Sequence, residues 1–278
     1  MTPELGGSLE EIRPGRRLHV AVRDIGADTT LFFLHGAGGN KEQWRFQWDS
    51  LGDVGCNLVA WDAIGHGRSP KPRKLAGYAG TELVADARVM LDRHRTRRTI
   101  LVAHSYGTRV ALALLLQGVP IDGLVLVGPP PLGQLSGRRL LGGVLGLLPL
   151  PLLELARPLL AHGFRQRAWH PDADPEMVRT EERAARRNRL SMMQALLANA
   201  PVLDEDRVSE PRLPILVLAG EQDGIVPIDI VARLTALLPG AELRRIDRCG
   251  HQVMLERPGD TDRAIRDMIL AVRKAQVP

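Results

Sequence analysis

The chain has 278 residues, which suffices for one large α/β domain and is too short for several domains of ordinary size. Hydrophobic residues make up 44% and charged residues 25%, as in a soluble globular protein, whereas aromatic residues make up only 4%, so the core must consist of Leu, Val, Ala and Ile. The net charge of +5 comes from scattered arginines without interleaved aromatic side chains. This pattern argues against nucleic-acid binding and favours solvated helix faces, with attraction of an anionic substrate or surface as the alternative.

Cysteine usage and the first residues bear on the cellular compartment. Cys56 and Cys249 are too few for the disulfide framework of a secreted domain. The first residues include acidic side chains and no apolar segment, so no signal peptide is expected and the cytoplasm is the expected location. No Cys/His cluster has the spacing of metal ligands, and neither a metal nor an organic cofactor is expected.

Short apolar runs alternate along the chain with helical patterns. Several runs, such as LFFL, ILVA and LVLV, are apolar throughout, which is typical of parallel strands covered by helices on both faces. The expected strands span residues 17–22, 30–34, 57–61, 99–103, 121–127, 214–219 and 241–246. The alternation predicts stacked βαβ units, with helices at residues 41–51, 80–94, 106–117, 229–238 and 258–275.

One stretch interrupts this alternation. Residues 129–211 contain no good strand, and their composition favours helices. The expected organisation is therefore a core of residues 1–128 and 212–278, with an inserted helical cap, or lid, at 129–211. Proline and glycine interrupt an apolar stretch at 140–160 in this cap, which argues against stable membrane insertion. Contact of this stretch with a membrane or a lipid stays an alternative.

The strongest single motif is ILVAHSYG at residues 100–107, in which Ser105 follows an apolar strand and precedes an Ala- and Leu-rich helix. Such a serine projects its hydroxyl from the sheet edge at a helix N-terminus, where backbone N–H groups and the helix dipole favour negative charge. The motif resembles the G-x-S-x-G nucleophile elbow of the α/β-hydrolase family, with Ala103 in place of the first glycine. The resemblance extends from about residue 17 to the end of the chain. It implies a mostly parallel, eight-stranded sheet flanked by helices, with Ser105 as the nucleophile.

Two further segments follow expected strands. LHGAGGN at residues 34–40 resembles the family's H-G-x-G oxyanion loop, which implies that the backbone N–H groups of Ala37 and Tyr106 form an oxyanion hole. A phosphate-binding loop is the weaker alternative, because no G-K-[ST] follows. DAIGHGRS at residues 62–69 resembles the family's D-x-x-G-x-G-x-S turn, in which Asp62 and His66 are interpreted as structural.

The acid and the base are expected late in the chain. GEQDGIVP at residues 220–227 resembles the family's G-x-x-D-x-x-V-P segment, which implies Asp223 as the acid rather than its neighbours Glu221 and Asp229. Of the eight histidines, His251 follows both the last expected strand and a glycine, and it is the expected general base. The resulting order of serine, aspartate and histidine along the chain is the order that this family uses.

These motifs predict a serine hydrolase that cleaves a carboxylic ester, or a related acyl compound, through a Ser-His-Asp triad and an acyl-enzyme. The Leu-rich cap predicts a small apolar substrate, with His35, Trp169, Met192 and Met193 as candidate pocket residues. Alternatives on the same triad are a carbon–carbon bond hydrolase, a thioesterase, a cofactor-free haloperoxidase (perhydrolase) and a hydroxynitrile lyase. A non-catalytic ligand receptor is a further alternative, whereas Ser105 argues against the aspartate nucleophile of epoxide and haloalkane hydrolases. The oligomeric state is not predicted.

Overall fold

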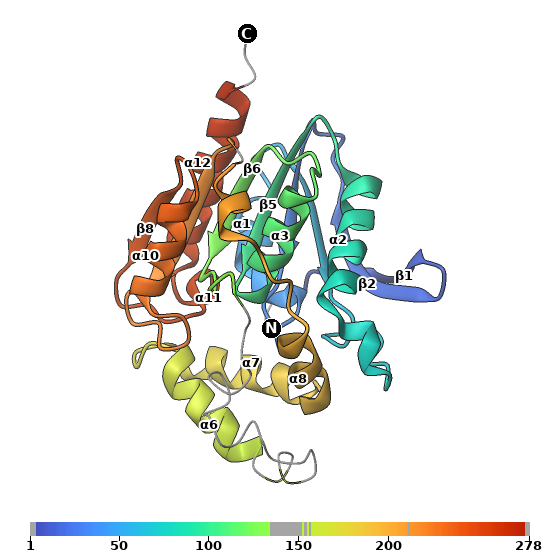
Figure 1. Ribbon diagram of the computed structural model, residues 1–278, viewed down its shortest axis with the longest axis vertical. Helices are drawn as coiled ribbons and strands as arrows, with labels where there is room; N and C mark the ends of the chain where they lie inside the picture. The colour runs from blue at the N-terminus through green and yellow to red at the C-terminus, as the bar shows by residue number, and fades with distance from the viewer. Residues whose placement is uncertain (1–3, 134–151, 153–154, 156, 211, 276–278) are drawn as a thin grey trace.

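An eight-stranded sheet forms the centre of the computed structural model, which describes residues 4–133, 152, 155, 157–210 and 212–275 (Figure 1). The strands lie in the order β1-β2-β4-β3-β5-β6-β7-β8. β1 and β4 pair with β2 in antiparallel orientation, and all other neighbours are parallel. The strands are β1 (Ser8–Arg13), β2 (Arg16–Arg23), β3 (Thr29–Leu34), β4 (Asn57–Asp62), β5 (Arg98–His104), β6 (Gly123–Val127), β7 (Ile215–Gly220) and β8 (Glu242–Ile246).

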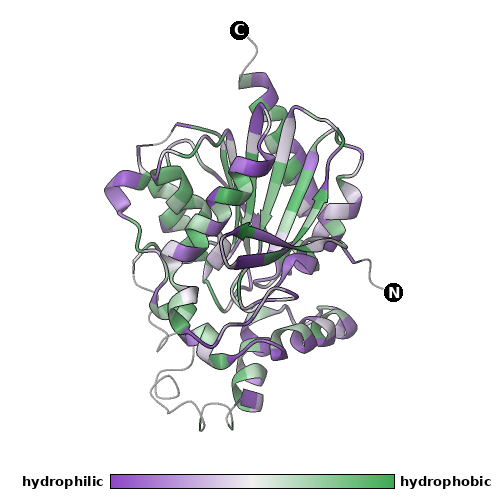
Figure 2. Ribbon diagram, turned by 90° about the vertical axis from the view of Figure 1, so that its right-hand side faces the viewer, coloured by the Kyte–Doolittle hydropathy of each residue, from purple (hydrophilic) through white to green (hydrophobic). Residues whose placement is uncertain are grey.

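The central strands are buried along their whole length, because helices cover the sheet on both faces. Alternate residues of a strand point to opposite faces. Thus Phe32 and Leu34 of β3 pack into one apolar cluster, and Leu31 and Phe33 pack into the other. Several strands of the sheet are accordingly green in Figure 2. The expected mostly parallel, eight-stranded sheet is confirmed.

The edge strand β1 was not among the expected strands. Its sequence, SLEEIR, is largely charged, and most of its residues are exposed or half-buried. It pairs with β2 through a turn that contains Gly15, whose φ of +70° suits glycine. A strand with solvent on one side lacks the continuous apolar run by which the buried strands are recognised.

Helices on the two faces divide the core between them. α2, α3 and α10 contribute to the cluster that contains Phe32, and α1, α11 and α12 contribute to the cluster that contains Phe33. The helix expected at residues 41–51 is divided into a 3-10 turn and a short α-helix. The helices of the core are η1 (Lys41–Trp44), α1 (Arg45–Ser50), η2 (Leu75–Tyr78), α2 (Gly80–His94), α3 (Tyr106–Leu116), α10 (Ile228–Leu237), α11 (Val253–Glu256) and α12 (Pro258–Ala275).

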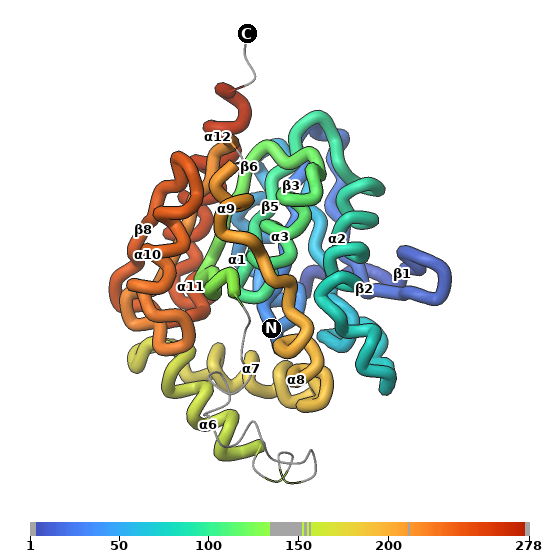
Figure 3. The backbone as a smooth tube through the Cα atoms, viewed as in Figure 1, coloured from blue at the N-terminus to red at the C-terminus, as the bar shows by residue number. Residues whose placement is uncertain are grey.

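Four described helices lie between β6 and β7 in the chain. They are α6 (Arg157–Ala168), α7 (Pro175–Arg186), α8 (Leu190–Ala198) and α9 (Glu205–Val208). α6, α7 and α8 lie together at the end of the sheet opposite the C-terminus (Figures 1 and 3). The carbonyl groups of Arg167 and Ala168, at the end of α6, accept hydrogen bonds from the N–H groups of Gly224 and His251 at 2.8 Å. The end of α6 therefore contacts the loops that follow β7 and β8.

Most of the apolar stretch at 140–160, for which contact with a membrane or lipid is the alternative interpretation, lies outside the described residues. Within the part of the chain that the structure describes, no helix combines the length and the apolar character that crossing a membrane requires.

Candidate active site

Ser105 occupies a sharp turn between β5 and α3. Its backbone has φ 49° and ψ −116°, a conformation that costs a residue with a side chain about 1–3 kcal/mol. Close packing holds this turn, because a Cβ at Gly107 would lie only 2.7 Å from the carbonyl oxygen of Leu34. Ala103 is fully buried, so the methyl group at the motif's first glycine position is accommodated in the core. The side chain of Ser105 caps no backbone N–H of α3.

His251 and Asp223 form a buried pair. The Nδ1 of His251 lies 2.6 Å from the Oδ2 of Asp223. The other carboxylate oxygen, Oδ1, accepts hydrogen bonds from the backbone N–H groups of Ile225 and Val226, at 2.7 and 2.8 Å. Both oxygens of Asp223 are therefore engaged in a site shielded from solvent. With Nδ1–H donated to the carboxylate, the Nε2 of the neutral ring is left as the proton acceptor.

His104 brings the base and the elbow together. Its Nε2 lies 3.0 Å from the backbone oxygen of His251, and the two ring centroids are 4.8 Å apart. Burial, and then the neighbouring His251, lower the pKa of His104 well below its usual range, so its ring is neutral and its Nε2–H donates. Ser105 is the next residue along the chain, and its N–H donates to Val127 at 2.8 Å. Gly128, the next residue after β6, packs closely against the ring of His251, since a Cβ added there would lie 3.1 Å from the ring.

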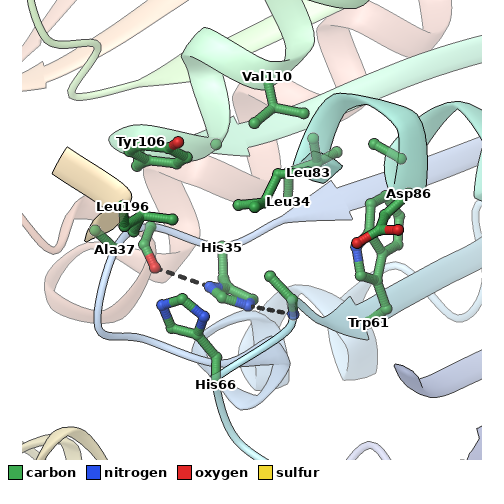
Figure 4. Close-up of a pocket in the computed structure, with 14 residues that line it drawn as sticks. Leu34, His35, Ala37, Trp61, His66, Leu83, Asp86, Tyr106, Val110 and Leu196 are labelled. Atoms are coloured by element: carbon green, nitrogen blue, oxygen red, sulfur yellow. Dashed lines mark hydrogen bonds between the residues drawn. The ribbon is translucent and has the colours of Figure 1, made fainter. Parts of the chain in front are cut away.

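The loop at residues 36–39 is anchored through its carbonyl groups. The oxygen of Gly36 accepts hydrogen bonds from the Nδ1 of His35, at 2.8 Å, and from the N–H of Gly39, at 3.1 Å. A peptide group is planar and trans, so anchoring this carbonyl also sets the direction of the Ala37 N–H at the other end of the same peptide. The Nε2 of His35 accepts from the N–H of Ala63 at 2.9 Å (Figure 4). Both ring nitrogens of His35 thus bond to the backbone, so His35 anchors the loop.

The turn at residues 62–69 supports the same loop. The N–H of Gly38 donates to the Nε2 of His66 at 3.1 Å. Burial, and then the neighbouring His35, lower the pKa of His66 to about 3, so that its ring is neutral at neutral pH. The carboxylate of Asp62 accepts two backbone N–H groups, each at 2.8 Å. These backbone contacts agree with the structural roles expected of Asp62 and His66.

A cavity of about 200 Å³ lies between the loop at residues 36–39 and the helices α6, α7 and α8, which are called the inserted helices below because they lie between β6 and β7 in the chain. Ala37 lines it together with Trp169 and Met193, two of the expected pocket residues. Met192 does not line it: its side chain is 1% exposed in the core, where a Cβ at Gly65 would lie 2.8 Å from its Cγ. The expected substrate contact of Met192 is thus corrected to core packing. The other apolar lining residues are Leu160, Ala161, Phe164, Ala184, Ala185 and Leu190, and the carboxamides are Gln43, Asn188 and Gln252.

A smaller cavity, of about 30 Å³, lies behind the loop (Figure 4). Ala37 and Tyr106, the two expected oxyanion donors, both line it, together with His35 and His66. The Tyr106 hydroxyl is buried there and has no hydrogen-bond partner among the described residues, and burial raises its pKa. Ala37 lines both cavities and therefore forms part of the wall between them.

The sequence matches the model of a known protein family. The model of the alpha/beta hydrolase family matches residues 31–264, which is most of the chain. The chain belongs to the alpha/beta hydrolase family.

Relatives of this alpha/beta hydrolase include named hydrolases. The 2-hydroxy-6-oxononadienedioate/2-hydroxy-6-oxononatrienedioate hydrolase of Paraburkholderia phymatum is 30% identical over 260 residues, which cover 87% of this chain and 88% of that protein. Protein ABHD8 of Homo sapiens is 28% identical over 270 residues, or 93% of this chain, and the chain spans only 60% of its length. An esterase from Exiguobacterium antarcticum shares the fold, with a TM-score of 0.79 and 18% identity over 96% of this chain and 100% of that one.

Several residues that hold the site of this alpha/beta hydrolase have no motif of their own. Asn188 donates to the carbonyl of Gly38, 150 positions away in the chain, and sequence spacing could not have identified that contact. Glu256 lies five residues after His251 and just before Pro258, and this position alone did not indicate its contacts. Its carboxylate accepts hydrogen bonds, at 2.8–3.2 Å, from the backbone N–H groups of His170, Gly250 and Gln252.

Proposed function

We propose that this alpha/beta hydrolase is a serine hydrolase, with Ser105 as nucleophile, His251 as general base and Asp223 as the acid that orients the base. The observation that carries the proposal is the buried 2.6 Å contact between the Nδ1 of His251 and the Oδ2 of Asp223. Ser105 is held in a strained turn at the N-terminus of α3, where an anion is favoured, and it follows His104, whose ring contacts the backbone oxygen of His251. The carboxylate fixes the ring so that its second nitrogen accepts a proton.

In the proposed reaction, the Oγ of Ser105 attacks the substrate carbonyl while its proton passes to the Nε2 of His251. The tetrahedral oxyanion accepts hydrogen bonds from the N–H groups of Ala37 and Tyr106, and each such donor contributes about 3 kcal/mol in comparable sites. His251 then protonates the departing alcohol, which leaves an acyl-enzyme on Ser105. Water, deprotonated by the same ring, hydrolyses this ester and restores the serine.

The substrate proposed for this site is a carboxylic ester with a compact apolar group. The cavity beside Ala37 has a volume of about 200 Å³ and a largely apolar lining. A dry cavity of about 150 Å³ accommodates benzene in another protein, so an aromatic ring or a short alkyl chain fits this volume. Residues 129–211, with α6 to α9, would form the cap over this group, since α6, α7 and α8 supply most of the lining.

A second candidate is hydrolysis of a carbon–carbon bond on the same triad. It is favoured by the relative from Paraburkholderia phymatum, which is 30% identical over 88% of its own length and is named as a hydrolase of an oxo-dienedioate. In that reaction the bond next to a ketone breaks, and the leaving carbon takes the proton from His251. A panel of p-nitrophenyl esters, acyl thioesters and vinylogous diketones separates the candidates, because the true substrate class has the highest kcat/KM.

A fluorophosphonate probe tests the nucleophile directly. The wild-type protein should gain the mass of one probe less hydrogen fluoride, because the serine oxygen displaces fluoride from phosphorus, and peptide mass spectrometry should locate the label at Ser105. The tetrahedral phosphorus resembles the proposed intermediate. Ser105→Ala should gain none, whereas Ser209→Ala, which removes an exposed hydroxyl at the end of α9, should label like the wild type. No label, or a label on another residue, would reject the proposal and favour a non-catalytic ligand receptor.

A further inference from the structure

Asn188 connects the inserted helices to the loop at residues 36–39. It lies in the turn between α7 and α8, and only 4% of its surface is exposed. Its Nδ2 donates to the carbonyl oxygen of Gly38 at 2.7 Å. From the other side, the N–H of Gly38 donates to the Nε2 of His66 at 3.1 Å. Gly38 is therefore held between a turn of the core and a turn of the insertion.

This double attachment bears on Ala37, the proposed oxyanion donor. The peptide before Ala37 is anchored through the carbonyl of Gly36, and the peptide after it is anchored through the N–H of Gly38. Because each peptide is planar, fixing both neighbours restricts the two backbone torsions of Ala37. Gly38 itself has φ +78°, and a Cβ there would lie 3.5 Å from the end of the Met193 side chain on α8. The loop at residues 36–39 thus packs closely against α8.

The Asn188 carboxamide is only half satisfied. Its Oδ1 is buried and has no hydrogen-bond partner among the described residues. An unpaired buried acceptor costs free energy, and an apolar side chain of similar size would avoid that cost. The hydrogen bond from Nδ2 to Gly38 therefore accounts for the presence of asparagine at position 188 despite this cost.

We propose that Asn188 is a positioning residue that couples α7 and α8 to the oxyanion loop. The inference rests on the proposed function, because the direction of the Ala37 N–H matters only if that group receives an oxyanion. Substrate in the large cavity contacts the two helices that the turn with Asn188 connects, since residues of α7 and α8, as well as α6, line the cavity. Displacement of these helices moves Asn188 and, through its hydrogen bond, the carbonyl of Gly38. This movement turns the N–H group of Ala37 away from the substrate carbonyl. Correct seating of the substrate and assembly of the oxyanion hole are thereby linked.

Kinetics of Asn188 variants test the coupling. Asn188→Ala and Asn188→Leu should lower kcat for p-nitrophenyl butyrate about tenfold and change KM less than twofold, because the oxyanion exists only after the substrate is bound. Asn199→Ala is the matched control. Its Nδ2 makes a hydrogen bond of the same length, 2.7 Å, but to Ala195 within α8, so its loss should leave kcat within twofold of the wild type. An unchanged kcat in Asn188→Ala, or an equal loss in Asn199→Ala, would overturn the coupling.

Hydrogen–deuterium exchange provides a readout that does not depend on activity. Peptides that cover residues 35–41 should exchange at least several times faster in Asn188→Ala than in the wild type, and at the wild-type rate in Asn199→Ala. Unchanged exchange in Asn188→Ala would overturn the inference even if kcat fell. A third outcome is faster exchange in Asn188→Ala together with a wild-type protein that neither hydrolyses esters nor reacts with a fluorophosphonate. This outcome would reject the hydrolase proposal and, with it, the catalytic role of the contact between Asn188 and Gly38.

Discussion

Ser105 is held in a conformation, φ 49°, that its neighbours must enforce. The strand, the small residues and the helix that surround it in the sequence were enough to predict the turn, because only such a pattern places a serine at this edge of a sheet. The contacts that enforce the turn could not be predicted. The approach of Gly107 to the carbonyl of Leu34, and that of His104 to His251, depend on how β3, α3 and the loop after β8 pack together.

Gly107→Ala should destabilise the protein by about 1–3 kcal/mol, because the new methyl group meets the backbone oxygens of Leu34 and His35 at 2.7 and 2.9 Å. The free energy of unfolding in urea measures this cost. Gly163→Ala is the control. Nothing lies within 4 Å of a Cβ there, and the position is inside α6, so alanine should stabilise by up to about 1 kcal/mol. Equal stabilities of the two variants would contradict the packing of the elbow.

The buried His66 should make stability fall in acid. Burial lowers its pKa from 6.5 to about 3, so between these values the unfolded chain binds a proton that the folded chain does not. The free energy of unfolding should therefore decrease as the pH falls from about 6.5 towards about 3, with a contribution from His66 of up to about 1.4 kcal/mol per pH unit. Urea unfolding of His66→Gln over this range should show a shallower slope, whereas the wild-type slope would contradict the assignment.

At the scale of helices and strands, Arg109 joins the insertion to the elbow. It lies on α3, one turn after Ser105, and is fully buried. Its guanidinium donates to the carbonyl groups of Pro131 and Leu132, which follow β6, and of Pro201, which lies between α8 and α9. Burial lowers the pKa of Arg109 to about 10. Composition predicted that helices and no strand follow β6 until β7, because the apolar strand pattern stops there, and the described residues of this segment agree. An arginine inside an apolar helix gave no sign of these partners.

Arg109→Met should reduce the free energy of unfolding by about 2–4 kcal/mol, because three backbone carbonyls lose their donor in a buried site. Arg88→Met on α2 is the comparison. Arg88 is half exposed, with a side-chain accessibility of 52%, and meets Asp92 at 3.8 Å, so its loss should change stability by less than about 0.5 kcal/mol. Urea unfolding of both variants measures the difference. A loss at Arg109 no larger than that at Arg88 would show that the insertion is not anchored there.

At the scale of the whole molecule, the sheet and the order of the motifs were predictable. Buried parallel strands have continuous apolar sequences, and loops that carry functional residues follow their carboxyl ends. The edge strand β1 was not predicted, because it is largely exposed and its charged sequence lacks a continuous apolar run. The substrate is less predictable still, since it depends on side chains of α6, α7 and α8 that meet only in the folded protein. Met192 illustrates this, because the fold buries it in the core and not in the lining of the large cavity.

Covalent catalysis by Ser105 is tested most directly by steady-state hydrolysis of a short p-nitrophenyl ester. Ser105→Ala should lower kcat by about 10⁴-fold or more, because the remaining binding site and oxyanion donors supply only a residual acceleration. Its circular dichroism and thermal unfolding should match those of the wild type, since the hydroxyl makes no cap to α3. A Ser105→Ala variant that keeps its fold and hydrolyses the ester within tenfold of the wild-type rate would contradict the assignment.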